Sequence, residues 1–163
     1  MKAPASTAQR GYGLFESMVS VLVVSIGFLG LASVQVNGLS SSNSSLLRSQ
    51  AIYLTYQMAD RMRANLPAAQ AGAYNGMSGA GSNPGCVTNG CTPAQMAQND
   101  YYEWSQEVAR LLPGGSAVVC IDSTPDDGEP GDPQCDSAGN VFSIKIWWTE
   151  KSEESRFITT FRP

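Results

Sequence analysis

Apolar positions first form one long run near the N-terminus and then change to a different spacing. Residues 18–36 are predominantly apolar, and no ionisable side chain occurs between Glu16 and Arg48. A helix of roughly 20 apolar residues can cross the hydrocarbon core of a bilayer, so the run predicts a membrane-spanning helix. The two charges nearest the N-terminus, Lys2 and Arg10, are positive, which favours a cytoplasmic N-terminus and export of the rest of the chain.

Beyond the run, apolar side chains recur every three or four residues, as on one face of an amphipathic helix. This stripe consists of Leu47, Ala51, Leu54, Met58 and Met62. It predicts that the helix continues to about Asn65 and that its second half packs on a folded domain. Pro67 ends the helix, because the residue before a proline is disfavoured in the α conformation. Residues 68–90 are rich in Gly, Ser and Asn and predict a long surface loop.

The rest of the chain predicts one more helix and then three strands. Thr92 and Gln95 form a capping box around Pro93, and Pro113 follows the helix. The helix face expected in solvent carries Asp100, Glu103 and Glu107. Alternating apolar and polar residues predict strands at 117–121, 142–148 and 157–161. The predicted fold class is therefore α+β, with the amphipathic half of the long helix packed on an antiparallel sheet of about three to four strands.

The two faces of the second predicted strand differ in character. One face is uniformly apolar and is expected to pack on the helix, whereas the other is mixed and includes Lys145 and Trp147. Two alternatives stay open for Trp147. It is either covered by a loop or exposed as a contact for a partner, since Trp is enriched in binding hot spots.

Composition narrows the chemistry that the chain can perform. The sequence has no histidine, and 14 acidic residues against ten basic ones, two of which lie in residues 1–11. The absence of histidine excludes Ser-His and Cys-His catalysis and His-based metal sites, and the acidic balance disfavours nucleic-acid binding. A catalytic pair of carboxylates is the alternative role for Glu103 and Glu107, but the sequence shows no sign of a pocket around them. We expect no enzymatic activity, no cofactor and no metal.

Four cysteines in an exported domain indicate two disulfides. Three pairings are open from sequence alone. We expect the local pairing, Cys86–Cys91 and Cys120–Cys135, because each pair brackets a Gly- or Pro-rich loop without a core of its own. In the chain-entropy model, closing a loop of about 15 residues contributes roughly 3 kcal/mol.

The connection between the first two predicted strands is acidic. It contains Asp126, Asp127, Glu129 and Asp132. Clustered carboxylates can hold calcium, whose ligands are oxygen atoms, but their spacing does not match the EF-hand loop. An acidic turn in solvent is the favoured interpretation, and calcium binding is the alternative.

The segment Arg10-Gly11-Tyr12-Gly13-Leu14-Phe15-Glu16 resembles the start of type IV pilins and the related pseudopilins. Members of this superfamily share a leader that ends in Gly, then an aromatic residue, and a Glu at the fifth mature position. The resemblance implies a pilin-like fold, cleavage by prepilin peptidase between Gly11 and Tyr12, N-methylation of Tyr12, and a role for Glu16 in assembly.

The resemblance also implies a division of the chain and a location for each part. Residues 1–11 are the prepilin leader, residues 12–39 the transmembrane or filament-core half of the long helix, and residues 40–163 the periplasmic or extracellular pilin domain. The protein is then expected as a single-pass inner-membrane protein with a cytoplasmic N-terminus before assembly, and afterwards in the pilus on the cell surface.

Residues 25–32 (Ser-Ile-Gly-Phe-Leu-Gly-Leu-Ala) and 91–95 (Cys-Thr-Pro-Ala-Gln) resemble the PilV-type minor pilins in particular. That resemblance implies a minor pilin at or near the pilus tip, which helps to initiate assembly for twitching motility and adhesion. Its expected partners are other minor pilins, the major pilin and a tip adhesin. The nearest alternative is a minor pseudopilin of a type II secretion system, and a membrane-tethered periplasmic enzyme is less favoured.

Glu16 separates the pilin interpretation from an ordinary signal peptide or a plain membrane anchor. Neither of these needs a carboxylate in the apolar entry, where an unpaired charge costs several kcal/mol. After cleavage, Glu16 could pair with the Tyr12 amine of its own chain, one helical turn away, or with that of a neighbouring subunit. A simple preference for an acidic residue at a helix start contributes less, under about 1 kcal/mol.

Overall fold

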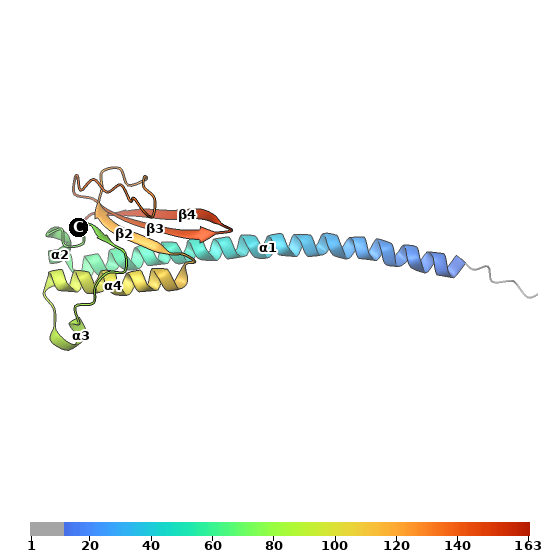
Figure 1. Ribbon diagram of the computed structural model, residues 1–163, viewed down its shortest axis with the longest axis horizontal. Helices are drawn as coiled ribbons and strands as arrows, with labels where there is room; N and C mark the ends of the chain where they lie inside the picture. The colour runs from blue at the N-terminus through green and yellow to red at the C-terminus, as the bar shows by residue number, and fades with distance from the viewer. Residues whose placement is uncertain (1–11) are drawn as a thin grey trace, which may run out of the picture. The chain divides into compact units, whose positions relative to one another are not determined.

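The computed structural model describes residues 12–163; the expected leader, with the Gly11 side of the cleavage site, lies outside the described residues. Its elements are α1 (Tyr12–Ala64), α2 (Leu66–Gln70), β1 (Met77–Ser78), α3 (Cys86–Asn89), α4 (Pro93–Leu111), β2 (Ser116–Ile121), β3 (Phe142–Glu150) and β4 (Glu153–Phe161) (Figure 1). The chain forms two compact units that divide between Asn43 and Ser44, within α1.

The first unit is the apolar N-terminal part of α1. Every described side chain from Gly13 to Leu39 is exposed. Among the described residues, α1 is the helix whose length and composition suffice to cross a membrane.

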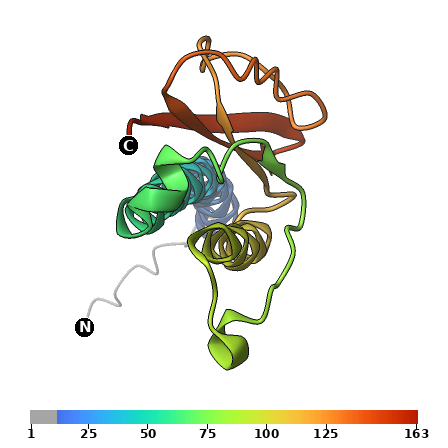
Figure 2. The same cartoon turned by 90° about the vertical axis from the view of Figure 1, so that its left-hand side faces the viewer.

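The second unit is an α+β domain in which helices cover one face of a sheet. Figure 2 shows α4 and the C-terminal part of α1 on one side of the sheet, and residues 122–140 on the other. The predicted stripe of α1 is buried in the core, with Leu54, Met58 and Met62 all fully buried. From α4, Trp104 enters the same core and donates its indole N–H to the Leu54 carbonyl oxygen at 2.8 Å. The predicted packing of the amphipathic half of the helix on the sheet is confirmed.

The sheet has four antiparallel strands in the order β1-β2-β3-β4. Ile144 of β3 lies opposite Val119 of β2 and Thr159 of β4. The hairpin between β3 and β4 turns through Lys151 and Ser152, whose positive φ values of 51° and 68° are those of a two-residue hairpin loop with the required right-handed twist. The predicted α+β class and the three predicted strands are therefore confirmed.

The capping box at the start of α4 is also present. Thr92 Oγ1 accepts a hydrogen bond from the Gln95 N–H at 3.3 Å, and Gln95 Oε1 accepts one from the Thr92 N–H at 3.0 Å. Each bond satisfies a backbone donor that has no partner inside the helix.

The prediction of one long loop over residues 68–90 is wrong in part, because most of α2 and all of β1 and α3 fall there. These elements have only two to five residues each. Strand β1 exists because Met77 and Ser78 pair with β2, and α3 lies within the ring closed by Cys86 and Cys91. Elements of this length depend on tertiary pairing and cross-links, which local sequence patterns do not reveal.

Candidate functional site

The candidate site is the exposed apolar half of α1, residues 13–39. Its large apolar side chains include Leu14, Phe28 and Leu29, which are 73%, 66% and 72% exposed. Burying a side chain of this size contributes about 1.5–3 kcal/mol relative to leaving it in water. A surface of this extent is therefore unfavourable in water and requires a lipid or protein environment.

Three serine hydroxyls in this part of α1 are satisfied within the helix. Ser17, Ser20 and Ser25 donate their hydroxyl hydrogens to carbonyl oxygens three or four residues earlier, at 2.7–2.8 Å. Serines bonded in this way present little unsatisfied polarity to an apolar environment.

Glu16 is the one charged side chain in residues 12–43, and it is exposed. None of the ion pairs found among residues 12–163 involves it. Tyr12 begins α1, four residues before Glu16, but the described structure does not include its side chain. The cleavage, methylation and assembly roles of Gly11, Tyr12 and Glu16 therefore stay predictions.

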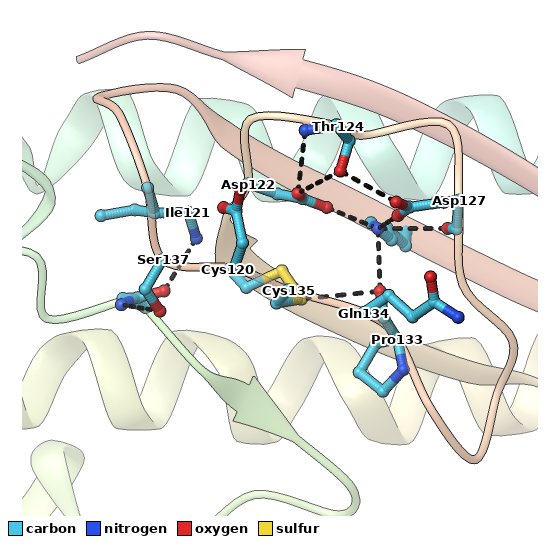
Figure 3. The surroundings of a disulfide bond; sticks show 12 residues. Cys120, Ile121, Asp122, Thr124, Asp127, Pro133, Gln134, Cys135 and Ser137 are labelled. Carbon is cyan, nitrogen blue, oxygen red and sulfur yellow. Dashed lines mark hydrogen bonds and ion pairs between the residues drawn. A yellow bond between two sulfur atoms is a disulfide. The ribbon is translucent and has the colours of Figure 1, made fainter.

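The structure joins Cys86 to Cys91 and Cys120 to Cys135, the two local pairs expected from the sequence. The first disulfide closes a ring around α3, in which Val87 is 95% exposed. The second disulfide ties Cys135, in the loop of residues 122–140 that is here called the covering loop, to Cys120 of β2. Figure 3 shows this disulfide beside Asp122 and Asp127.

Trp147 lies on the face of the sheet that does not pack on the helices, as predicted. It forms a small apolar cluster with Val118 and Cys120, and Cys135 of the covering loop packs against this cluster. Because Trp147 is only 1% exposed, the covered alternative describes it, and its burial leaves no surface for the exposed-contact alternative in this subunit.

Lys145, on the same face as Trp147, is fully buried, and the sequence pattern alone predicts no partner for its charge. Its ammonium lies 2.6 Å from Asp122 Oδ2 and 3.0 Å from Asp127 Oδ1. Asp122 is likewise fully buried, whereas Asp127 is partly exposed. The hydrogen bond from Lys145 lowers the pKa of Asp127 below its usual value. A lone lysine in an apolar strand that precedes or follows an acidic connection is the sequence signal that could have suggested this pairing.

The acidic residues proposed as alternative calcium ligands do not converge. Asp126, Glu129 and Asp132 are exposed, and Asp127 turns to Lys145 instead. Among the described residues, the group whose donor atoms do lie close together is Cys120, Asp122 and Cys135. Its two sulfur atoms are bonded to each other, and a disulfide sulfur is not the thiolate that binds metal.

The carboxylates of α4 hold that helix to α1 and do not form a catalytic pair. Glu103 accepts a hydrogen bond from Arg61 at 2.9 Å, and Glu107 accepts one from Gln57 at 3.0 Å. The bond from Arg61 lowers the pKa of Glu103.

The expectation that Asp100 lies in solvent is wrong. Asp100 is 8% exposed, accepts a 2.6 Å hydrogen bond from Tyr74 and lies 3.4 Å from Arg61. Burial raises its pKa above the usual value. The helical face that a wheel assigns to solvent is covered here by the segment that carries Tyr74, a contact that periodicity does not encode.

The structure has one long helix with an exposed apolar half, and the other half of this helix packs on an antiparallel sheet. This is the architecture expected from the pilin resemblance. A family model described as "Tt1218-like: Type IV pilin Tt1218" matches residues 33–102. No curated protein and no solved structure matched the chain. The matched residues do not include the motif at 10–16, so the family model and the motif support the type IV pilin superfamily from separate parts of the chain. A pilin is a structural subunit and not an enzyme, and an apolar N-terminal helix fits membrane anchoring and incorporation into a pilus.

Proposed function

We propose that the protein is a minor pilin of a type IV pilus, which joins the pilus at or near its tip and helps to initiate assembly with other minor pilins and the major pilin. The observation that carries this proposal is the uncovered apolar half of α1. All described side chains from Gly13 to Leu39 are exposed, whereas the folded unit buries a core of its own. The exposed half needs partners that the folded unit does not provide.

The proposal gives this surface two successive environments. It spans the inner membrane, with the N-terminus in the cytoplasm, before assembly, and it lies among the helices of neighbouring subunits afterwards. Lipid and helix surfaces are similarly apolar, so hydrophobic burial alone does not favour either environment. Specific contacts must therefore determine which environment is more stable, and the close approach of helices at small residues provides one kind of such contact.

Three glycines in α1 are consistent with such contacts. A Cβ atom on Gly27, Gly30 or Gly38 would meet nothing within 4 Å. No contact within the described part of the chain therefore requires glycine at these positions, and a neighbouring helix would supply the requirement. The alternative, that these glycines are merely tolerated, predicts no effect of larger residues on assembly.

Glu16 provides the second specific contact in the proposal. Cleavage between Gly11 and Tyr12 by prepilin peptidase, followed by N-methylation, leaves a positive amine on Tyr12. An unpaired carboxylate in an apolar environment costs several kcal/mol, and pairing with the Tyr12 amine of a neighbour removes much of that cost. The pairing would therefore favour the assembled state over a lone subunit in the membrane.

The resemblance of residues 25–32 and 91–95 to PilV-type minor pilins supports the minor, tip-proximal role. It also supports participation in twitching motility and adhesion, with a tip adhesin as a further partner. The order of events is then membrane insertion, cleavage, and incorporation with the other minor pilins.

The test uses the full-length protein with a short epitope tag after Pro163, expressed in a deletion strain of its own organism. We expect the deletion to reduce surface pili and twitching, and the tagged protein to restore both. In sheared pili it should be far less abundant than the major pilin and should be labelled at pilus ends by immunogold. A deletion that leaves pili intact and blocks type II secretion would identify a minor pseudopilin instead and would refute the pilus role.

A further inference from the structure

The ammonium group of Lys145 is surrounded by oxygen atoms of the covering loop. It lies 2.6 Å from Asp122 Oδ2 and 3.0 Å from Asp127 Oδ1, and it donates to the carbonyl oxygens of Asp127 at 3.1 Å and Pro133 at 2.8 Å. Four oxygen atoms from one loop therefore surround a buried positive charge. Removing such a charge from water is costly unless close partners compensate for it, and here they do.

These oxygen atoms are of the kinds that bind calcium. Carboxylates and backbone carbonyls are typical Ca²⁺ ligands, and they adapt to its flexible geometry. The two carboxylates carry two negative charges against the single positive charge of Lys145. A divalent ion at the same place would neutralise both.

Bonds that do not involve Lys145 hold the carboxylates in place. Asp122 Oδ1 accepts a hydrogen bond from the Thr124 N–H at 3.0 Å, and Asp127 Oδ2 accepts one from the Thr124 hydroxyl at 2.8 Å. One threonine thus orients both carboxylates, and it would continue to do so without the lysine (Figure 3).

The carbonyl oxygen from Pro133 is also fixed by its surroundings. A Cβ atom on Gly128 would lie only 2.4 Å from it, and Gly128 has a φ of +87°, so this close approach requires glycine. The disulfide between Cys120 and Cys135 ties the same segment to β2. The oxygen atoms around Lys145 are therefore positioned by a turn and a cross-link as well as by the lysine itself.

We infer that Lys145 occupies an internal cation site of the covering loop, and that the same oxygen atoms bind Ca²⁺ when an uncharged, shorter side chain replaces the lysine. The chain supplies its own cation, so the native loop closes over Trp147 and Val118 without calcium. This goes beyond the proposed pilin function and holds whether or not the protein joins a pilus.

The first test compares thermal unfolding of the full-length protein in detergent micelles with EDTA or with millimolar Ca²⁺. The variant is Lys145→Ala, and the matched control is Lys151→Ala, which removes an exposed lysine from the β3–β4 turn. We expect the Tm of the wild type to be the same in EDTA and in Ca²⁺, and the Tm of the control likewise. Lys145→Ala should lose on the order of 10 °C in EDTA, because it leaves two carboxylates without their cation.

Calcium should restore at least half of that loss, and NaCl of equal ionic strength should not. Adding Asp127→Asn to Lys145→Ala should abolish the recovery. A rise in the Tm of the wild type with Ca²⁺ would show that the lysine does not fill the site. Failure of Ca²⁺ to raise the Tm of a folded Lys145→Ala would show that the oxygen atoms do not form a cation site. Either result overturns the inference.

A second measurement needs no variant and remains decisive if Lys145→Ala does not fold. The native wild type is treated briefly with an amine-acetylating reagent in EDTA, and each lysine is then quantified by mass spectrometry. Lys151 should react readily, and Lys145 should be protected at least tenfold relative to it. Equal labelling of the two lysines without calcium would contradict a site that is closed by the lysine alone.

Discussion

The apolar half of α1 and the outer face of the sheet both combine large apolar side chains with an ionisable group. These groups are exposed in α1 and buried on the sheet. In α1, Phe28 is 66% exposed, and none of the described ion pairs includes Glu16. On the outer face of the sheet, Trp147 is 1% exposed, and Lys145 is paired with Asp122 and with a second carboxylate. The two surfaces are made of similar residue types and differ in whether the chain covers them.

The difference shows where the chain depends on other molecules. The covering loop, with its disulfide and its buried ion pairs, completes the outer face of the sheet without any partner. Among the described residues, none covers the side chains of residues 13–39, and their exposed apolar area requires lipid or other helices. Substitutions in the folded unit should therefore change its stability, whereas substitutions in the apolar half should change assembly.

The largest expected effect separates the two regions by stability. Trp104→Ala removes a fully buried side chain and its hydrogen bond to Leu54, and should lower the free energy of unfolding of the folded unit by about 3–5 kcal/mol. Phe28→Ala, at an exposed position of α1, should change it by less than about 0.5 kcal/mol. Denaturant titration in micelles, followed by the fluorescence of the remaining tryptophans, measures both. An equal loss in Phe28→Ala would mean that the apolar half belongs to the folded core.

The next effect compares the two disulfides. Replacing Cys120 and Cys135 by serine opens a loop of 15 residues and should cost about 3 kcal/mol, whereas replacing Cys86 and Cys91 opens a ring of five and should cost about 2 kcal/mol. Acrylamide quenching provides a second measurement. Quenching of Trp147 should increase only in the first variant, because only that disulfide holds the covering loop. Increased quenching in the Cys86/Cys91 variant would show that the covering loop is not what protects Trp147 from acrylamide.

The smallest effect concerns two carboxylates on α4 with opposite responses to pH. Burial raises the pKa of Asp100, and the hydrogen bond from Arg61 lowers the pKa of Glu103. When folding raises the pKa of a carboxyl group, stability falls as the pH rises above the usual carboxyl pKa of about 3.9. When folding lowers the pKa, the carboxylate stabilises the folded state, and this stability is lost as the pH falls. From about pH 3 to about pH 6, the wild type should therefore lose stability relative to Asp100→Asn and gain it relative to Glu103→Gln.

Chemical denaturation at several pH values measures both differences. The Glu103 effect should be the smaller one, because its side chain is 47% exposed and water screens its pairing. If the two differences had the same sign, Asp100 and Glu103 would not have the surroundings that the structure gives them. Phe28→Ala serves as the control, since a substitution in the apolar half should leave the pH profile of the folded unit unchanged.

The elements that the sequence predicts correctly are those with a long local signal. Helix α1 and helix α4 have sustained apolar periodicity or a capping box, and the three long strands alternate clearly. Strand β1 and the short helices were missed, because two to five residues carry no periodicity and depend on their partners. Long elements can be predicted from their own residues, and short ones only from their contacts.

The covering loop shows a second limit of sequence reasoning. Alternation correctly predicts that Lys145 and Trp147 lie on the face away from the helices, but it leaves open whether a loop covers Trp147 or a partner contacts it. The loop covers them because Asp122 and Asp127 meet the buried ammonium, an arrangement between residues more than 15 positions apart in sequence. A period of two describes which face a residue occupies, and it does not describe what covers that face.

The fate of Glu16→Leu in the native organism tests the proposed role of α1 in assembly. In the proposed role, the apolar half of α1 functions in assembly and Glu16 supplies its specific contact. The variant should be inserted, exported and cleaved after Gly11 like the wild type, because leucine is at least as compatible with an apolar helix. The matched control, Glu154→Leu, changes an exposed carboxylate of β4 and should not affect incorporation.

The measurement is the amount of each protein in sheared pili relative to the amount in the membrane fraction, with N-terminal sequencing of the membrane form to verify cleavage. Cleaved Glu16→Leu should stay in the membrane and be reduced at least tenfold in pili, while Glu154→Leu should reach pili at the wild-type level. Cleaved Glu16→Leu in pili at the wild-type level would show that Glu16 has no role in assembly and is no more than a favourable residue at the start of a helix.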